Sequence, residues 1–263
     1  MKRLVLIGVA VVALKCVVAA AAGSAGAHAS CGATQTASTA EPARAEAIAI
    51  DGSLSTGSPN LRREYRQAAL AEVEAVANEQ AAVRVVVFGA SGVGARVIFV
   101  GSFVPVSTVY AFNLAARNRL LCLAKRALAS AFIGQTRRAG TDVAGAIAEQ
   151  AAWAQAEVRP HGKVSLLAIT DGCEAPAPSG ANAHLTDVCG DLRKGRTPAW
   201  ILSRHRREFS LGDGRGVRLT MEGVGVGKDQ STASTLRAEQ LVAFWRLACR
   251  RSRWACDIRS AFS

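Results

Sequence analysis

The sequence predicts an α/β fold, namely a doubly wound, mostly parallel sheet with helices on both faces and one antiparallel edge strand. Nearly continuous apolar segments, typical of strands buried on both faces, alternate along the chain with helical segments. Two of these strands are separated by so short a turn that they must form an antiparallel hairpin. Half of the 263 residues are hydrophobic, which is enough for a sizeable core.

Residues 1–30 are expected to be a signal peptide of bacterial type. A basic start, "MKR", precedes the apolar run "LVLIGVAVVAL" and a small-residue stretch with Ala27-x-Ala29 as a cleavage site. Cleavage directly before Cys31, with lipid attachment to that cysteine, is an alternative, as is an uncleaved anchor. The protein is therefore expected to be extracytoplasmic, either secreted or associated with the cell envelope.

Residues 31–44 are rich in Ala, Thr and Ser and predict a flexible linker. Residues 45–263 are expected to form a single domain. It starts with a short strand, "AEAIAI", and with a helix, "NLRREYRQAALAEVEAVANEQ", whose apolar residues recur at helical spacing. The nearly all-apolar strand "AAVRVVVFGA" follows, and the strand "ARVIFVGSF" completes the hairpin.

The second half of this domain is mainly helical. Two helices are predicted, "AFNLAARNRLLCLAKRALASAF" and "TDVAGAIAEQAAWAQAEV", and then the buried strand "KVSLLAIT". Residues 181–211 are expected to be irregular to helical. The segment "GVRLTMEGVGVG" is expected to be the last strand, before the amphipathic helix "STLRAEQLVAFWRLACRR".

Export makes disulfide bonds the expected state of the cysteines. No pair has C-x-x-C spacing, so a zinc site is not expected. Cys173 and Cys189 flank a polar loop and are predicted to pair. Cys249 and Cys256 can pair only if the last helix ends between them, because seven helical residues rise about 10 Å.

Cys122 lies in a helical pattern and is expected to be a buried free thiol. If Cys31 carries lipid, five cysteines of the mature chain remain, and one of them must stay unpaired.

The formal net charge is +12, and removal of the signal region would remove only three basic residues and no acidic one. Such a surface favours acidic partners or an anionic cell envelope. Nucleic acid is not an expected partner, because the arginines are spread along helices without aromatic residues between them or a recognised binding module.

Polar residues gather where strands are expected to end. Asp51 ends the first strand and is followed by Ser53 and Ser55, Asp171 ends "KVSLLAIT", and Thr141 lies just before a helix. In a doubly wound sheet, ligands bind outside the carboxyl ends of the strands. These side chains are therefore expected to converge on one edge.

This pattern resembles the metal-ion-dependent adhesion site (MIDAS) of the von Willebrand factor A (vWA) domain. The residues that match are Asp51-Gly52-Ser53-Leu54-Ser55 for D-x-S-x-S, Thr141 in a second loop, and Asp171 followed by Gly. The resemblance spans residues 45–252. It implies that Asp51, Ser53, Ser55, Thr141 and Asp171 bind Mg²⁺, or Mn²⁺ or Ca²⁺, and that an exposed Asp or Glu of a protein partner completes the site.

The chemistry of the residues agrees with a cation site. Mg²⁺ prefers about six oxygen ligands, and these side chains supply only oxygen with two formal charges. A lightly charged site leaves the ion electrophilic, with a position for an acidic group from outside. In the alternative interpretation, Asp51 and Asp171 only stabilise turns. Asp142, beside Thr141, is either an outer-sphere acid or an early-turn residue favoured by the helix dipole.

We therefore expect an exported vWA-like module for adhesion or assembly, without catalysis. The alternative is a secreted serine hydrolase of the α/β type that uses Ser91, with Asp171 and His184 or His205 in the order of a triad. The segment around Ser91 lacks the final Gly of a nucleophile elbow. Its glycines do not form a nucleotide loop either, because a strand follows where the phosphate-binding helix should begin.

Overall fold

The structure is a computed structural model. It describes residues 31, 41–89, 95–133, 140–158, 162–175, 187–205, 211–212, 214–226 and 232–262. The expected signal peptide and most of the expected linker lie outside the described residues.

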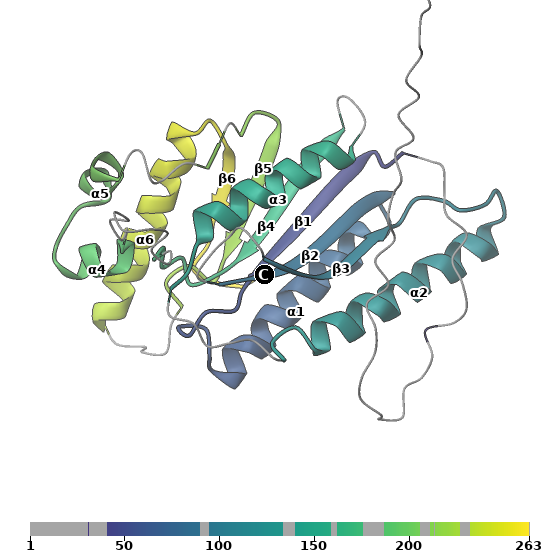
Figure 1. Cartoon of the computed structure of the whole chain (residues 1–263), viewed down its shortest axis with the longest axis horizontal. Coiled ribbons are helices and arrows are strands. Elements are labelled where there is room, and N and C mark those ends of the chain that lie inside the picture. The colour runs from purple at the N-terminus through teal and green to yellow at the C-terminus, as the bar shows by residue number, and fades with distance from the viewer. Residues whose placement is uncertain are drawn as a thin grey trace, which may run out of the picture. The chain divides into compact units, whose positions relative to one another are not determined.

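A six-stranded sheet organises the described residues in the order β3-β2-β1-β4-β5-β6 (Figure 1). Its strands are β1 (Arg44–Asp51), β2 (Ala81–Phe88), β3 (Arg96–Ser102), β4 (Lys163–Ile169), β5 (Val217–Glu222) and β6 (Ala255–Ile258). All neighbouring strands are parallel except β2 and β3, which form the antiparallel hairpin. The predicted fold class is confirmed.

Strand β1 lies at the centre of the sheet. Every residue after Arg44 is buried, with an uninterrupted apolar run from Ala47 to Ile50. It pairs with β2 on one side and with β4 on the other, in register, so that Ile50 lies opposite both Val87 and Ile169. Strands buried on both faces need such uninterrupted apolar runs. The register places the ends of β1 and β4 at the same edge.

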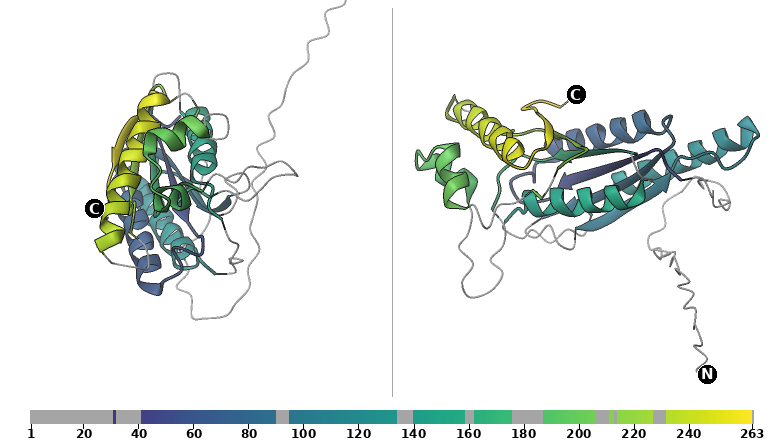
Figure 2. Two further views of the ribbon diagram at one scale, coloured as in Figure 1. Left: turned by 90° about the vertical axis from the view of Figure 1, so that its left-hand side faces the viewer. Right: turned by 90° about the horizontal axis from the view of Figure 1, so that it is seen from above.

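Helices cover both faces of this sheet. They are α1 (Pro59–Val76), α2 (Tyr110–Ala129), α3 (Val143–Glu157), α4 (Val188–Arg193), α5 (Pro198–Arg204) and α6 (Thr232–Arg251). Helix α1 begins where Ser58 caps it, since Ser58 Oγ accepts a hydrogen bond from the Leu61 amide at 3.1 Å and Pro59 occupies the first turn. In Figure 2, α1 and α2 lie on the opposite side of the sheet from α3.

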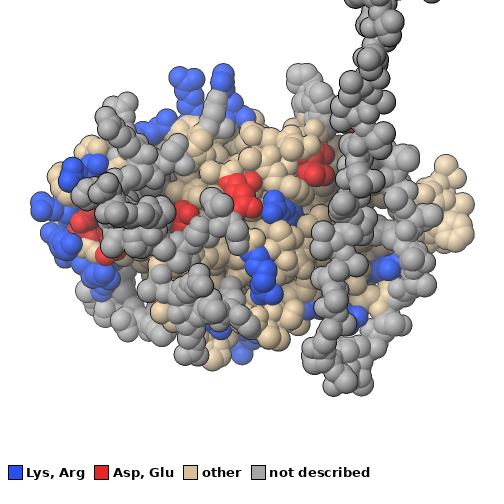
Figure 3. Space-filling model, viewed as in Figure 1, with Lys and Arg blue, Asp and Glu red and all other residues tan. Residues whose placement is uncertain are grey.

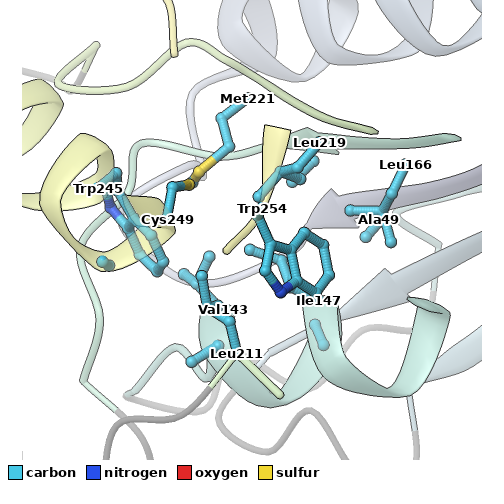
Figure 4. Close-up of a cluster of buried hydrophobic side chains, with 14 of the residues drawn as sticks. Ala49, Val143, Ile147, Leu166, Leu211, Leu219, Met221, Trp245, Cys249 and Trp254 are labelled. Atoms are coloured by element: carbon cyan, nitrogen blue, oxygen red, sulfur yellow. The ribbon is translucent and has the colours of Figure 1, made fainter. Parts of the chain in front are cut away.

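The two faces bury separate cores, because side chains alternate along each strand. Residues such as Ile48 and Ile50 pack against α1 and α2. Their neighbours on the other face, such as Ala49, pack with α3 and α6 in a cluster that includes the labelled residues of Figure 4. Trp245 of α6 is fully buried there.

The expectation that "GVRLTMEGVGVG" contains the last strand is wrong, because β6 follows α6 and pairs in parallel with β5. After α6 the chain turns sharply at Arg253, which has a φ of 58°. Trp254 is then buried, and its indole Nε1 donates to the Gly212 carbonyl at 3.2 Å. The buried Trp254 therefore holds the next four residues, which form β6, at the edge of the sheet.

Three disulfides connect the six cysteines that lie among the described residues. The predicted Cys173–Cys189 pair is confirmed. Cys249 and Cys256 also pair, because α6 ends between them at Arg251. Cross-links of this kind are typical of extracytoplasmic proteins.

The prediction of a buried free thiol at Cys122 is wrong, because Cys122 is bonded to Cys31. Cys122 is only half-buried on α2, so a distant segment can reach its sulfur. The bridge also uses the Cys31 thiol that lipid attachment would require, so the two states exclude each other.

None of the described helices combines the length and the apolar character needed to cross a bilayer.

Thiol titration of the unfolded, unreduced mature chain should find no free cysteine. Cys31→Ser should expose one thiol, on Cys122, and should lower the free energy of unfolding by on the order of 4 kcal/mol, because the bridge closes a long loop. A free thiol in the wild-type chain would contradict the pairing. Cys122→Ser should give the same loss of stability.

Candidate metal centre

The candidate centre lies where β1 and β4 end side by side. Asp51 is the last residue of β1, and the register of β1 with β4 places it beside Thr170. The Thr170 hydroxyl donates a hydrogen bond to Asp51 Oδ2 at 2.8 Å. This bond fixes one carboxylate oxygen of a side chain that is fully buried.

The loop after β1 folds back on Asp51. The Ser53 amide donates to Asp51 Oδ1 at 2.8 Å, and the Thr56 hydroxyl donates to the carbonyl oxygens of Asp51 and Ser53 at 3.1 and 2.9 Å. The hydroxyl oxygens of Ser53 and Ser55 are 2.9 Å apart. The side chain of Ser55 also hydrogen-bonds to Asp171. Both serines of the motif therefore face the centre.

Asp171 is held by the turn that follows β4. The Cys173 amide donates to Asp171 Oδ1 at 2.9 Å. Gly172 has a φ of +76°, and a Cβ there would lie 3.0 Å from Trp245 Nε1, which already donates to the Gly172 carbonyl at 3.0 Å. Glycine is required at this position because of both the backbone conformation and the close approach of α6.

Thr141 lies in the neighbouring loop. Its amide and carbonyl bond to the carbonyl and amide of Ala175, both at 2.7 Å, so the loop is attached to the segment after Asp171. Its buried hydroxyl makes no hydrogen bond to the other four predicted ligands in the described part of the chain. The structure thus joins Asp51, Ser53, Ser55 and Asp171 through hydrogen bonds and attaches the Thr141 loop to the segment that follows Asp171.

Asp142 is the N-cap of α3, since its carboxylate Oδ1 accepts from the Gly145 amide at 2.8 Å. Of the two interpretations considered for it, the early-turn residue matches this geometry.

Glu174 anchors the two loops to each other. Its Oε2 accepts hydrogen bonds from the amides of Val143 and Ala144 at 2.8 and 2.9 Å, at the start of α3. Burial, with a contribution from nearby Asp142, raises the pKa of Glu174 to about 8. At neutral pH the carboxyl group therefore carries a proton.

The two aspartates of the centre repel each other. Burial, and then repulsion from Asp171, raises the pKa of Asp51 to about 7, although the Ser53 amide and the Thr170 hydroxyl lower it. Burial also raises the pKa of Asp171. Within the described ranges, no Lys, Arg or His forms an ion pair with either carboxylate.

Tyr65 of α1 lies near this pair. Its hydroxyl is buried, and no described residue is its hydrogen-bond partner. Burial, and then repulsion from Asp51 and Asp171, raises the pKa of Tyr65. Buried hydroxyls are usually hydrogen-bonded, so the Tyr65 hydroxyl agrees with a centre that also binds a water or an ion.

The side chains present fit a hard divalent cation. They offer carboxylate and hydroxyl oxygens, the ligands preferred by Mg²⁺, and a positive charge would offset the repulsion between Asp51 and Asp171. Among the described residues, no three His, Cys, Asp or Glu side chains gather closely enough to hold a metal. A cation here would therefore rely on hydroxyls beside two carboxylates.

Three residues of this centre were not predicted from the sequence as site residues. Thr170 carries a local signal, since it is the hydroxyl residue that ends an apolar strand just before Asp171. Tyr65 belongs to the apolar stripe of its helix. Glu174 has no local signal, because its role depends on α3 lying against its loop.

The parts needed for a hydrolase are not brought together in the described residues. Ser91 and His184 lie outside them. His205 Nε2 lies 3.4 Å from Asp191 Oδ2, and Asp171 is bonded to Ser55 and to the Cys173 amide instead of to a histidine.

No family model and no curated protein matches the chain. Solved structures with a related arrangement include a pilus adhesin, SpaC from Lactobacillus rhamnosus GG, at 13% identity and a TM-score of 0.43, covering 86% of this chain and 28% of the adhesin. BatB from Bacteroides thetaiotaomicron is 13% identical with a TM-score of 0.40, over 84% and 91% of the two chains.

The manganese-loaded TRAP protein of Plasmodium vivax is 12% identical with a TM-score of 0.38, over 74% of this chain and 61% of TRAP. The chain spans less than a third of the length of the adhesin. Similarities of this size indicate no function for the chain.

Glu174→Gln tests the proton assigned to this carboxyl group. The folded wild type keeps the proton up to about pH 8, whereas the unfolded chain loses it near the ordinary pKa of 4.5. The stability that the group contributes is therefore complete below that lower pKa and is lost as the pH rises through 8. Gln does not titrate and retains an acceptor for both amides.

The melting temperature of the wild type, compared with that of Glu174→Gln, should therefore fall by several degrees between about pH 5 and pH 9, as followed by circular dichroism. A difference that stays constant over this range would show that Glu174 is already ionised in the folded chain.

Proposed function

We propose that this chain is an exported vWA-like module that binds a divalent cation, Mg²⁺ or one of similar chemistry, and through it an acidic group of a protein partner. The ligands would be Asp51, Ser53, Ser55, Thr141 and Asp171. The role would be adhesion or assembly.

One observation carries this proposal. Asp51 ends β1 and Asp171 follows β4, and they are 0% and 3% exposed. They are linked through Ser53 and Ser55, without a cationic side chain of the described part to compensate them. Burial of two neighbouring carboxylates is costly unless a proton or a cation neutralises them. The hydroxyls that face them do not remove this repulsion, but they are suitable ligands for a cation.

The ligand set also favours an acidic partner. Two carboxylates balance the charge of a divalent ion without exceeding it, and the hydroxyl ligands add no negative charge. When bound, the ion would supply a Lewis-acidic site for a carboxylate oxygen from outside. The strongly basic chain would favour the approach of an acidic protein at longer range.

The connected loops would keep the ligands in place before the ion binds. Ala175 holds the Thr141 loop through two backbone hydrogen bonds, and Glu174 holds the start of α3. Such preorganisation lowers the conformational cost of binding.

Calorimetric titration of the mature chain with Mg²⁺ and Mn²⁺ should detect one bound ion. Asp51→Asn and Asp171→Asn should each weaken binding at least about tenfold, because each removes a charged ligand while keeping its shape. Asp257→Asn is the matched control, since this exposed carboxylate of β6 pairs with Arg259.

Binding that is unchanged in both site variants, or weakened equally in the control, would refute the site. Melting curves in a chelator show whether each variant remains folded. An ion that binds only weakly should still raise the wild-type melting temperature at millimolar concentration and leave that of the site variants unchanged.

The Cys173–Cys189 bridge should affect partner binding more than metal binding. It closes the loop that follows Asp171, whereas Asp171 itself is also held by Ser55 and by its carbonyl, which accepts from the Gly225 amide at 2.8 Å. With Cys173→Ser/Cys189→Ser, Mg²⁺-dependent capture on immobilised polyglutamate should fall several-fold further than Mg²⁺ affinity. Equal loss of both would count against this role of the bridge.

A further inference from the structure

An open pocket of about 600 Å³ lies at the opposite edge of the sheet from the candidate metal centre. It is formed where β4 and β5 begin, next to the turn that precedes β6, and its lining includes Lys163, Ser165, Arg218 and Arg253. Figure 3 shows Lys and Arg side chains along the upper edge of the molecule, above β5 and β6. The metal proposal uses none of these residues.

Three cationic side chains of this pocket have no acidic partner in the part of the chain that the structure describes. Lys163, Arg218 and Arg253 are exposed, and none of them forms an ion pair with another described residue. Lysine and arginine gathered in this way raise the local potential, and an anion is the ligand that offsets it.

The register of the sheet brings two of these cations onto one face. Ser165 lies opposite Arg218 in the parallel pair of β4 and β5, and Lys163 is two residues before Ser165. Side chains two residues apart on a strand share a face. The Ser165 side chain lies on the same face, where it hydrogen-bonds to Glu46.

The third cation is placed by a rigid turn. Arg253 has a φ of 58° and lies within the short loop closed by the Cys249–Cys256 disulfide. The next residue, Trp254, is buried, and its amide donates to the Cys249 carbonyl at 3.1 Å. The backbone of Arg253 is thus fixed at the pocket rim.

The opposite wall of the pocket is acidic. Arg44 lines it, but its guanidinium already donates to Glu46 at 2.7 Å and also to Glu79. Its charge is therefore satisfied within the protein. Among the described residues, the unpaired positive charge of the pocket lies on the side formed by the start of β4, β5 and the turn before β6.

We propose that this pocket binds a small ligand that carries at least two phosphate groups or one phosphate with further negative charge. Arg218 and Arg253 would each donate two parallel N–H groups to phosphate oxygens, and Lys163 would add a point charge. The phosphate could belong to a soluble compound or to a lipid headgroup of the cell envelope. The binding requires no metal ion.

Calorimetry with inorganic pyrophosphate, at low salt and in the presence of EDTA, tests the soluble source. The wild type should bind, and Lys163→Gln, Arg218→Gln and Arg253→Asn should each weaken binding about tenfold. Asn suits the left-handed backbone at residue 253. Glu79→Gln should strengthen binding several-fold, because it removes the negative charge of the opposite wall.

Arg63→Gln is the matched control, since it removes the same charge from an exposed position on α1 that does not line the pocket. A general effect of net charge would weaken binding in this control as much as in the pocket variants and would overturn the proposal.

Sedimentation with vesicles tests the lipid source. Vesicles with about one fifth cardiolipin in phosphatidylcholine should capture the wild type and Arg63→Gln but not the pocket variants, if the ligand is a headgroup, because cardiolipin carries two phosphate groups. If the pocket variants lose binding to pyrophosphate and the wild type does not bind vesicles, the ligand is a soluble compound. If the wild type binds vesicles and the pocket variants do not, the ligand is a lipid headgroup. Absence of binding to both probes overturns the proposal. The chelator makes every outcome independent of the metal site.

Discussion

The in-register parallel pairing of β1 with β4 is the constraint on which the rest of the candidate centre depends. It places the end of β1 beside the end of β4, so that the hydroxyl of Thr170 reaches the carboxylate of Asp51. A shift of one residue would turn every side chain of β1 to the other face and would exchange the two cores. The apolar pattern of β1 therefore fixes the position of the aspartate as well as the stability of the sheet.

The free-energy cost of burying carboxyl groups at this edge of the sheet is reduced in two different ways. Glu174 keeps a proton and accepts two amide hydrogen bonds, so that it supports the start of α3 without a charge. Asp51 has a pKa raised by burial and by the nearby Asp171, and a proton held there would be exchanged for a cation. The protein thus keeps a neutral support next to a pair that can change its charge.

Local patterns predicted much of this architecture. Apolar runs identified the four buried strands, and the short turn identified the antiparallel hairpin. Asp51 and Asp171 were expected at one edge because the strands end there, and hydrogen bonds through Ser53 and Ser55 do connect them. Metal binding by these side chains stays a prediction.

The features that were not predicted depend on long-range packing. Strand β6 has only four residues, and the anchoring of Trp254 rather than its own pattern makes it a strand. The Cys31–Cys122 bridge joins positions 91 residues apart, a separation at which sequence spacing carries no information about proximity. The sequence around Glu174 gives no indication that its carboxyl group accepts hydrogen bonds from amides at the start of α3.

Strand β4 connects the two ends of the molecule that carry the proposed sites. Lys163 begins it and Asp171 lies just beyond its end, a separation of roughly 26 Å for extended backbone. Because β4 is hydrogen-bonded on both sides, this separation cannot change without breaking the sheet. A protein held at the metal edge and an anion held at the other edge would therefore be kept at a fixed spacing, with the domain acting as a rigid spacer between them.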